Sequence, residues 1–214
     1  HYEIIIVDDN TDTSTYSLQI KKYCKYKYFF EERKPGKSLF KKLSNVIFQN
    51  IVIPFLDKHP SIYYNLFIKE KFDVEIAFLE NRCAKIIGSS KNKNSKKYLW
   101  IHIDLKQNNW VKHQFKDINE QQLYYNKFDR IFCVSDTVKT SFNELFGLRD
   151  KTKILYNPYD DKEIKELSKI EIDVDKFEKR FRFITVGRFV KQKGFDRLLE
   201  AHKILINQGY NYEL

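Results

Sequence analysis

The feature that most constrains the fold is a regular alternation of short apolar runs with amphipathic segments between residues 72 and 156. Short apolar runs bounded by polar residues are typical of buried strands, and apolar residues at helical spacing indicate helices. Strands that alternate with helices in this way form mostly parallel sheets with helices on both faces. The expected strands are 74–79, 98–103, 130–134 and 153–156, and the helices between them are 82–88, 118–127 and 137–146.

A second unit of the same kind begins after the break at Asn157-Pro158. The charged, largely helical segment that follows is expected to connect two domains, and a buried strand, an amphipathic helix and a further strand then follow it. The predicted fold class is α/β, with a Rossmann-like, doubly wound parallel sheet followed by the first β-α-β part of a second Rossmann-like domain. The expected parts are a first domain at 1–158 that lacks its first strand, a connector at 159–180 and the start of a second domain at 181–214.

A long amphipathic helix is expected from Lys37 to Phe55. Its apolar residues recur at helical spacing, and Lys37, Lys41 and Lys42 lie beside that stripe. An apolar stripe flanked by lysines fits attachment to an acidic membrane surface, so these lysines are membrane-surface candidates. The alternative is a helix whose apolar stripe faces the protein core and whose lysines face solvent.

Composition restricts the class of partner. The chain has 39 Lys and Arg against 29 Asp and Glu, a formal net charge of +10. This balance favours a phosphate-bearing substrate, an acidic membrane surface or nucleic acid, although a solvated lysine-rich surface would give the same numbers. Three widely spaced cysteines without a C-x-x-C pair indicate neither a disulfide framework nor a zinc knuckle, and they fit a reducing, cytoplasmic setting. Because the chain contains no Met and ends directly after a strand-like pattern, both ends are expected to be truncations.

Two glycines and two cations lie between the strand and the helix of the second unit: Gly187, Arg188, Lys193 and Gly194. Gly187 allows a tight turn, and the N-terminus of the following helix offers unpaired N–H groups and the positive end of its dipole. Arg188 supplies a bidentate fork and Lys193 a compact cation, so the loop fits a diphosphate. An ordinary loop with exposed cations is the alternative.

His102 is the other candidate, at the end of the expected strand 98–103 and followed by Asp104. Ligands of parallel sheets bind at the carboxyl ends of the strands, where an imidazole can hydrogen-bond a ligand hydroxyl. A histidine satisfied by packing is the alternative. A His-x-Asp metal pair is conceivable, but no third ligand is evident, and no metal site is predicted.

Four segments in this order resemble a known family: 72–80, 100–104, 129–139 with 156–158, and 184–199. They are similar to the GT-B, family-four retaining glycosyltransferases, notably bacterial enzymes of capsule, teichoic-acid and lipopolysaccharide assembly. Three features depart from the family pattern. Its Gly-rich first loop would lie before His1, its Glu-x7-Glu segment would lie beyond Leu214, and Glu80-Asn81 stands where Glu-Gly is expected.

The resemblance implies a donor, an acceptor and a role for each candidate residue. Arg188 and Lys193 match the pair that holds the donor diphosphate and stabilises the leaving group, Gly187 and Gly194 match the glycines of that loop, and His102 matches a histidine that contacts the donor sugar. The donor would be a nucleotide sugar of UDP type, used without a metal or other cofactor, and the acceptor a saccharide or a lipid-linked saccharide. The expected location is the cytoplasm, including the inner face of its membrane, with no nucleic-acid partner. A non-catalytic basic module that binds a membrane or polyanion and a GT-B sugar-nucleotide epimerase remain as alternatives.

Overall fold

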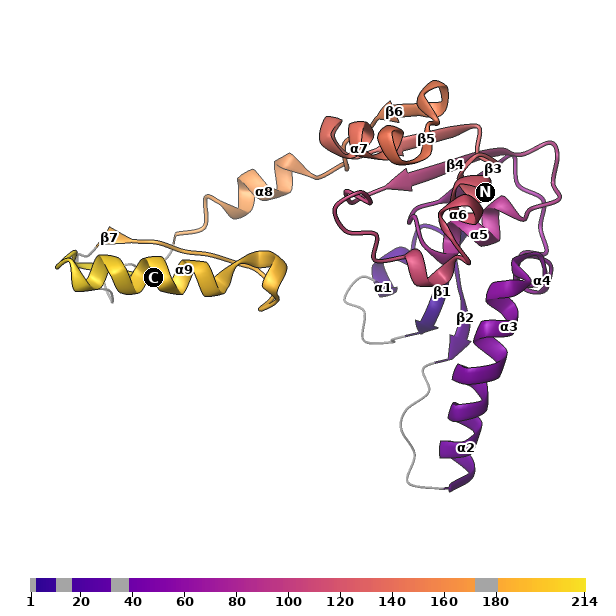
Figure 1. The fold of residues 1–214 in the computed structure, drawn as a ribbon, viewed down its shortest axis with the longest axis horizontal. Helices are drawn as coiled ribbons and strands as arrows, with labels where there is room; N and C mark the ends of the chain where they lie inside the picture. The colour runs from indigo at the N-terminus through magenta and orange to yellow at the C-terminus, as the bar shows by residue number, and fades with distance from the viewer. Residues whose placement is uncertain (1–2, 11–16, 32–38, 172–180) are drawn as a thin grey trace. The chain divides into compact units, whose positions relative to one another are not determined.

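The computed structural model describes residues 3–10, 17–31, 39–171 and 181–214 (Figure 1). Contacts within the chain divide it into one unit of residues 1–158 and another of residues 159–214, and each is described by itself. The function of each unit is still a prediction from the sequence.

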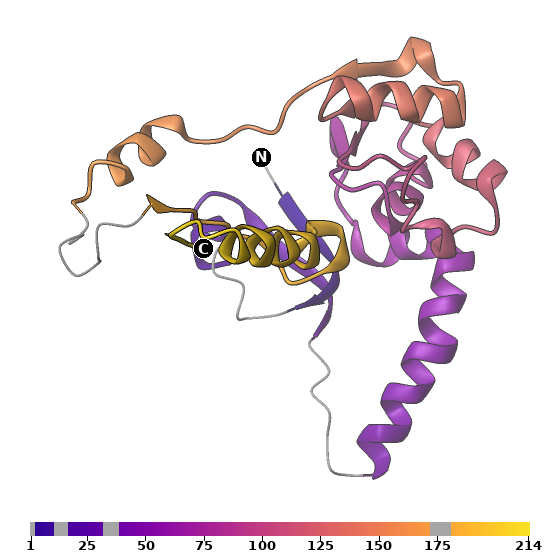
Figure 2. The ribbon, with the colours of Figure 1, turned by 60° about the vertical axis from the view of Figure 1, so that its left-hand side comes forward.

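The first unit is built on a four-stranded parallel sheet (Figures 1 and 2). The strands stand side by side in chain order, and a helix joins each strand to the next, as the alternating sequence pattern predicts. The strands are β3 (Val74–Ala77), β4 (Lys96–Ile101), β5 (Arg130–Cys133) and β6 (Thr152–Ile154), and the helices are α5 (Arg82–Gly88), α6 (Ile118–Tyr125) and α7 (Asp136–Phe146), with short 3-10 turns η2 (Lys112–Gln114) and η3 (Arg149–Lys151).

One face of this sheet holds the core of the unit. Right-handed crossovers between neighbouring strands in chain order place α5, α6 and α7 on the same face. Leu99, Ile131 and Cys133 point to that face and are fully buried, and the burial raises the pKa of the Cys133 thiol to about 12. Ile76 and Phe78, which alternate with the buried positions of β3, are 48% and 54% exposed. The described helices between the strands therefore cover one face of the sheet.

Side-chain caps fix where the three helices begin. Asn81 accepts a hydrogen bond from the Cys83 N–H, and Asp117 and Ser135 cap α6 and α7 in the same way. The cap of α7 is Ser135 and not the neighbouring Asp136, because the Ser135 hydroxyl accepts the Val138 N–H. This helix ends at Gly147, which has a φ of 68°, a conformation that favours glycine.

The N-terminal part contains a separate parallel strand pair and a long helix. The helix begins at Leu39 and runs without interruption to Lys58, with a π-helical stretch in its middle. Pro54 lies in the first turn of the last helical piece, where its missing N–H is tolerated. The elements are β1 (Glu3–Asn10), α1 (Ser17–Ile20), β2 (Lys25–Glu31), α2 (Leu39–Ile47), η1 (Phe48–Val52), α3 (Ile53–Lys58) and α4 (Pro60–Phe67).

The apolar stripe of the long helix does not face a core. Leu43, Val46, Ile47, Ile51 and Phe55 are between 44% and 62% exposed. Burial is confined to positions off this stripe, chiefly Phe48 and Leu56. The core-facing interpretation of the stripe is therefore wrong for these described residues. No helix within the described ranges is long and apolar enough to cross a membrane.

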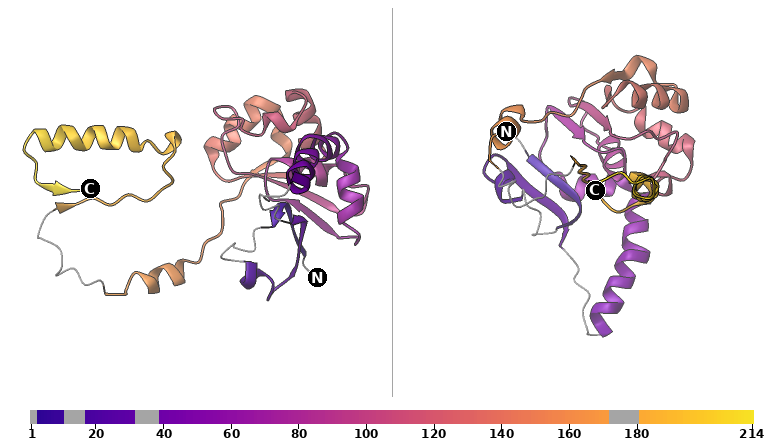
Figure 3. Two further views of the ribbon diagram at one scale, coloured as in Figure 1. Left: turned by 90° about the horizontal axis from the view of Figure 1, so that it is seen from below. Right: turned by 90° about the vertical axis from the view of Figure 1, so that its left-hand side faces the viewer.

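The second unit is small, with one helix beside a short strand pair (Figure 3), and most of its described residues are exposed. The expected buried strand at 181–186 is wrong: only two of its residues form a strand, and Ile184 and Val186 are 91% and 93% exposed. One helix beside two short strands is too small to bury the apolar side chains of this run. His202 of the helix packs against the second of these strands, with its Nδ1 2.8 Å from the Tyr212 hydroxyl. The elements are α8 (Asp161–Leu167), β7 (Phe181–Arg182), η4 (Lys191–Lys193), α9 (Phe195–Asn207) and β8 (Tyr212–Glu213), and β7 pairs with β8 in parallel.

Candidate functional site

A buried carboxylate, Glu80, lies beside His102 at the carboxyl ends of β3 and β4. Glu80 is 1% exposed, and its Oε2 accepts a hydrogen bond of 3.2 Å from the backbone N–H of His102. Its Oε1 accepts a hydrogen bond of 3.1 Å from the indole N–H of Trp110. Glu80 thus joins the end of β4 to the loop that carries Trp110.

The His102 ring lies at the place that the sequence predicts, directly after the last residue of β4. Its side chain is 18% exposed, and its ring meets the Phe78 ring edge-on at 5.0 Å between centroids. Its Nδ1 is 3.7 Å from Oε2 of Glu80, too far for a hydrogen bond, and makes none to any described residue. Packing alone therefore leaves a buried polar atom of His102 unsatisfied, which the packed-histidine alternative does not explain.

A second layer of hydrogen bonds holds Glu80 from behind. The Tyr125 hydroxyl donates to the backbone carbonyl of Glu80 at 2.6 Å, and the side-chain amide of Gln121 donates to that hydroxyl at 2.9 Å. Asn109 in turn donates to Gln121 at 2.9 Å. Burial raises the pKa of Tyr125 far above its ordinary value, so the phenol stays a neutral donor. These contacts fix the backbone from which the Glu80 carboxylate projects.

Asp104 takes part in the fold of its own loop. Its carboxylate accepts hydrogen bonds from the N–H groups of Lys106 and Gln107 and from the Ser141 hydroxyl. Burial by itself would raise the pKa of Asp104, but these hydrogen bonds hold it below its ordinary value. Asp104 therefore ties the loop after β4 to α7. The described residues contain no group of three or more metal-binding side chains.

Asn81, which replaces the glycine of the family pattern, fits its position. Its φ is −89°, so the backbone there does not require glycine, and its side chain caps α5 through the Cys83 N–H at 3.0 Å. The departure from the pattern therefore leaves the turn after Glu80 without strain.

The four candidate residues of the second unit lie in one loop before α9. The Phe189 ring stacks on the Phe195 ring at 4.5 Å, and the Lys193 N–H donates to the Val190 carbonyl at 2.9 Å, so the loop folds back on the helix start. Gly194 has a φ of 68°, which favours glycine. A Cβ on Gly187 would lie 3.4 Å from the Phe195 ring, an ordinary contact.

Arg188 and Lys193 are exposed, and the start of α9 beside them is uncapped. No side chain among the described residues caps the helix, and its first internal hydrogen bond runs from the Leu198 N–H to the Gly194 carbonyl. The Gly194 N–H donates to the Lys191 carbonyl, and the N–H groups of 195–197 remain as possible donors to an anion. Asp196 in the same turn is a negative charge that weakens this attraction.

The structure thus describes the predicted residues in two separate parts. Gly187, Arg188, Lys193 and Gly194 share one loop of the second unit, and His102 belongs to the first. Sequence reasoning did not assign a role to Glu80, although its position after β3, the strand next to β4, is a usable signal. It also missed Trp110 and Tyr125. Of the membrane-surface candidates, Lys37 lies outside the described residues, and the side chains of Lys41 and Lys42 are likewise not described.

Comparisons with known proteins give the fold. Scans of protein-family models and of curated proteins find no match. Among solved structures, the chain is similar to Anabaena HepE in complex with UDP and glucose, with a TM-score of 0.57 and 15% identity over 93% of this chain and 49% of that one. It is also similar to the same protein in complex with UDP-glucose, with a TM-score of 0.53 and 15% identity over 94% of this chain and 57% of that one. The chain thus spans about half the length of these structures. With the parallel sheet, the likeness confirms the expected fold class, an α/β protein of GT-B type with a Rossmann-like sheet.

Proposed function

We propose that this chain is part of a glycosyltransferase that moves a sugar from a nucleotide diphosphate sugar to a saccharide or lipid-linked acceptor. The observation that carries the proposal is the loop before α9, where exposed Arg188 and Lys193 stand beside an uncapped helix N-terminus. A diphosphate is the ligand that such a set of cations and N–H groups recognises. The likeness to a structure that holds UDP and glucose supports the same donor class, a UDP-sugar.

In this proposal each candidate residue has a separate role, and none of these roles requires a metal. Arg188 and Lys193 would neutralise the charge that develops on the leaving diphosphate, the point at which electrostatic stabilisation lowers the barrier most. His102 would offer its Nε2 to a donor-sugar hydroxyl, since its Nδ1 is on the side of Glu80. Transfer with retained configuration, in cell-surface polysaccharide or glycolipid synthesis at the cytoplasmic face of the membrane, completes the proposal and rests on the family resemblance.

The loop predicts a specific loss of nucleotide binding. UDP is expected to bind the chain, and Arg188→Gln with Lys193→Gln is expected to weaken it roughly 10-fold or more per residue, because each charge-assisted hydrogen bond is worth about 1.5–3 kcal/mol. Isothermal titration with UDP, GDP, ADP and UMP measures the affinity and identifies the base. Lys162→Gln with Lys203→Gln removes the same charge outside the loop and should bind as wild type. Equal losses in both double variants would show non-specific charge attraction and contradict the proposal.

A second function, attachment to an acidic membrane, is favoured by the exposed stripe of the long helix. Ile47 and Ile51 are 44% and 62% exposed, and Lys41 and Lys42 belong to the same helix. A helix of this kind lies in the membrane interface with its apolar side chains buried among the lipids. We propose that this helix holds the chain at the membrane surface where a lipid-linked acceptor resides.

Replacing Ile47 and Ile51 with serine is expected to reduce binding to phosphatidylglycerol vesicles by at least about 100-fold, because each isoleucine that enters the lipid contributes roughly 1.5–3 kcal/mol. Vesicle co-sedimentation measures this change. The matched control is Ile164→Ser with Ile170→Ser, since these residues are 56% and 64% exposed in the other unit. Unchanged sedimentation of the first variant would exclude this helix as the attachment site.

A further inference from the structure

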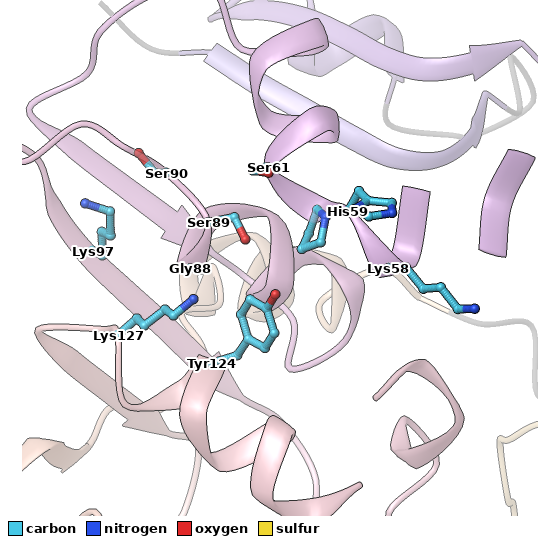
Figure 4. Close-up of a pocket in the computed structure, with 10 residues that line it drawn as sticks. Lys58, His59, Ser61, Gly88, Ser89, Ser90, Lys97, Tyr124 and Lys127 are labelled. Atoms are coloured by element: carbon cyan, nitrogen blue, oxygen red, sulfur yellow. The ribbon is translucent and has the colours of Figure 1, made fainter. Parts of the chain in front are cut away.

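A basic pocket of about 580 Å³ opens in the first unit, away from His102 (Figure 4). Its volume is within the range of small-molecule sites and far exceeds that of a single ion. Lysines, hydroxyls and a histidine contribute most of its lining, and none of the described residues that line it carries a carboxylate. The lining residues are Lys58, His59, Pro60, Ser61, Gly88, Ser89, Ser90, Lys97, Tyr124 and Lys127.

Two ammonium groups give the pocket its charge. Lys97 donates to the Asn92 carbonyl at 2.8 Å and to the Ser95 hydroxyl at 2.9 Å, so two of its three N–H groups go to neutral acceptors. The Lys127 ammonium lies 4.2 Å from the centre of the Tyr124 ring, and burial lowers the pKa of Lys127. Figure 4 shows the Lys127 ammonium beside Tyr124 and Ser89, Lys97 further out beyond Lys127, and Lys58 on the other side, pointing away.

The nearby carboxylates Glu75 and Glu120 make their described contacts with groups other than Lys97 and Lys127, and Glu75 Oε2 has no hydrogen-bond partner among the described residues. Glu75 accepts hydrogen bonds from the hydroxyls of Tyr64 and Ser90, so the Ser90 proton is committed to it. Glu120 pairs with Lys85 at 3.4 Å and accepts the Lys116 N–H. Neither carboxylate lines the pocket, and the positive charge of Lys97 and Lys127 faces it without a direct acidic partner in the described contacts.

Tight packing keeps the walls of the pocket in place. Arg82 of α5 forms a two-pronged ion pair with Asp57 of α3, with hydrogen bonds of 2.6 and 3.1 Å. A Cβ on Gly88 would lie 3.2 Å from the Tyr124 side chain, so α5 and α6 approach closely at the floor of the pocket. A preformed site loses little entropy when it binds its ligand.

The pocket lies at the opposite end of β4 from the candidate donor site. Lys97 is the second residue of this strand and His102 follows its last residue, so about 16 Å of strand separates them at ~3.3 Å per residue. The ends of α5 and α6 bring in Ser89 and Lys127 at the same edge of the sheet. A nucleotide-sugar donor would bind at the carboxyl ends of the strands. The pocket lies at their amino ends, so we expect it to bind a different ligand.

We propose that this pocket binds a phosphate ester, with the phosphate held by Lys97, Lys127 and the Ser89 hydroxyl and with room for a polar group such as a sugar or glycerol. A phosphate offers several strong acceptor oxygens, which match two ammonium groups and a hydroxyl better than a single carboxylate does. The same chemistry occurs in a soluble sugar phosphate and in a phospholipid headgroup. The proposal does not depend on the transferase function.

Titration calorimetry on the whole chain tests the proposal with inorganic phosphate, glucose 1-phosphate and dihexanoyl phosphatidylglycerol below its micelle concentration. At least one probe is expected to bind, and Lys97→Gln with Lys127→Gln is expected to weaken it at least 100-fold, about tenfold per charge-assisted contact. Binding of glucose 1-phosphate indicates a soluble ligand, and binding of the lipid alone indicates a headgroup. Lys127→Gln, which removes a side chain that makes no hydrogen bond to the described residues, serves alone if the double variant does not fold.

Two controls separate this site from general charge and from the donor loop. Lys153→Gln with Lys162→Gln removes two exposed charges outside the pocket and should leave binding unchanged. Arg188→Gln with Lys193→Gln should also leave it unchanged, whatever its effect on UDP. Absence of binding by all three probes, or an equal loss in the Lys153 and Lys162 control, would overturn the proposal.

Discussion

Phe142→Ala is expected to lower the free energy of unfolding of the first unit by about 3–5 kcal/mol, the usual cost of deleting a buried aromatic ring. Phe142 is 1% exposed on α7. Its ring centroid is 4.8 Å from that of Phe146 and 5.7 Å from that of Tyr125, so the cavity would open in the middle of an aromatic cluster. Urea unfolding monitored by circular dichroism measures the change.

The control for this prediction is Leu123→Ala on α6, where the side chain is 65% exposed. Removing an exposed leucine changes stability by about 0.5 kcal/mol or less. A Phe142 variant as stable as the Leu123 variant would show that the aromatic cluster does not hold the helices on the sheet.

Glu80→Ala is expected to cost roughly 1–3 kcal/mol, because it leaves two part-buried N–H donors without their acceptor. The donors are the Trp110 indole and the His102 backbone. Thermal or urea unfolding measures the loss. Glu80→Gln keeps one acceptor oxygen and should lie between wild type and the alanine variant.

Nuclear magnetic resonance of the two tryptophan indoles provides a readout specific to this contact. The Trp110 indole N–H resonance is expected to move upfield in Glu80→Ala as its hydrogen bond disappears. The Trp100 indole has no hydrogen-bond partner among the described residues, so its resonance should stay in place. Glu144→Ala breaks only the exposed ion pair with Lys106 and is expected to cost less than about 1 kcal/mol. A stationary Trp110 signal, or equal destabilisation by both substitutions, would contradict the role assigned to Glu80.

The central sheet could be predicted because its signals are local. The bounds of α5 agree with the sequence expectation at both ends, since Asn81 caps the helix at one end and the polar residues from Ser89 follow it at the other. The strands were expected about one or two residues from where they lie. Gly147 likewise stops α7 through a backbone preference that belongs to the residue itself.

Contacts between distant segments could not be predicted from the sequence. The number of helices and strands that cover a given apolar surface could not be predicted either. The hydrogen bond from Tyr125 to Glu80 spans 45 residues, and the one from Trp110 spans 30, so no local pattern announces the buried carboxylate. The run 181–186 is as apolar as a core strand, yet Ile184 is exposed because too little chain surrounds it.

The chain-order arrangement of β3, β4, β5 and β6 also sets the course of folding during synthesis. Each strand pairs with the strand made just before it, so its partner already exists when it leaves the ribosome. The loops to be closed are short, which keeps the entropic barrier to each pairing low. The sheet can therefore grow one strand and one helix at a time, and each of β4, β5 and β6 finds a partner that is already made.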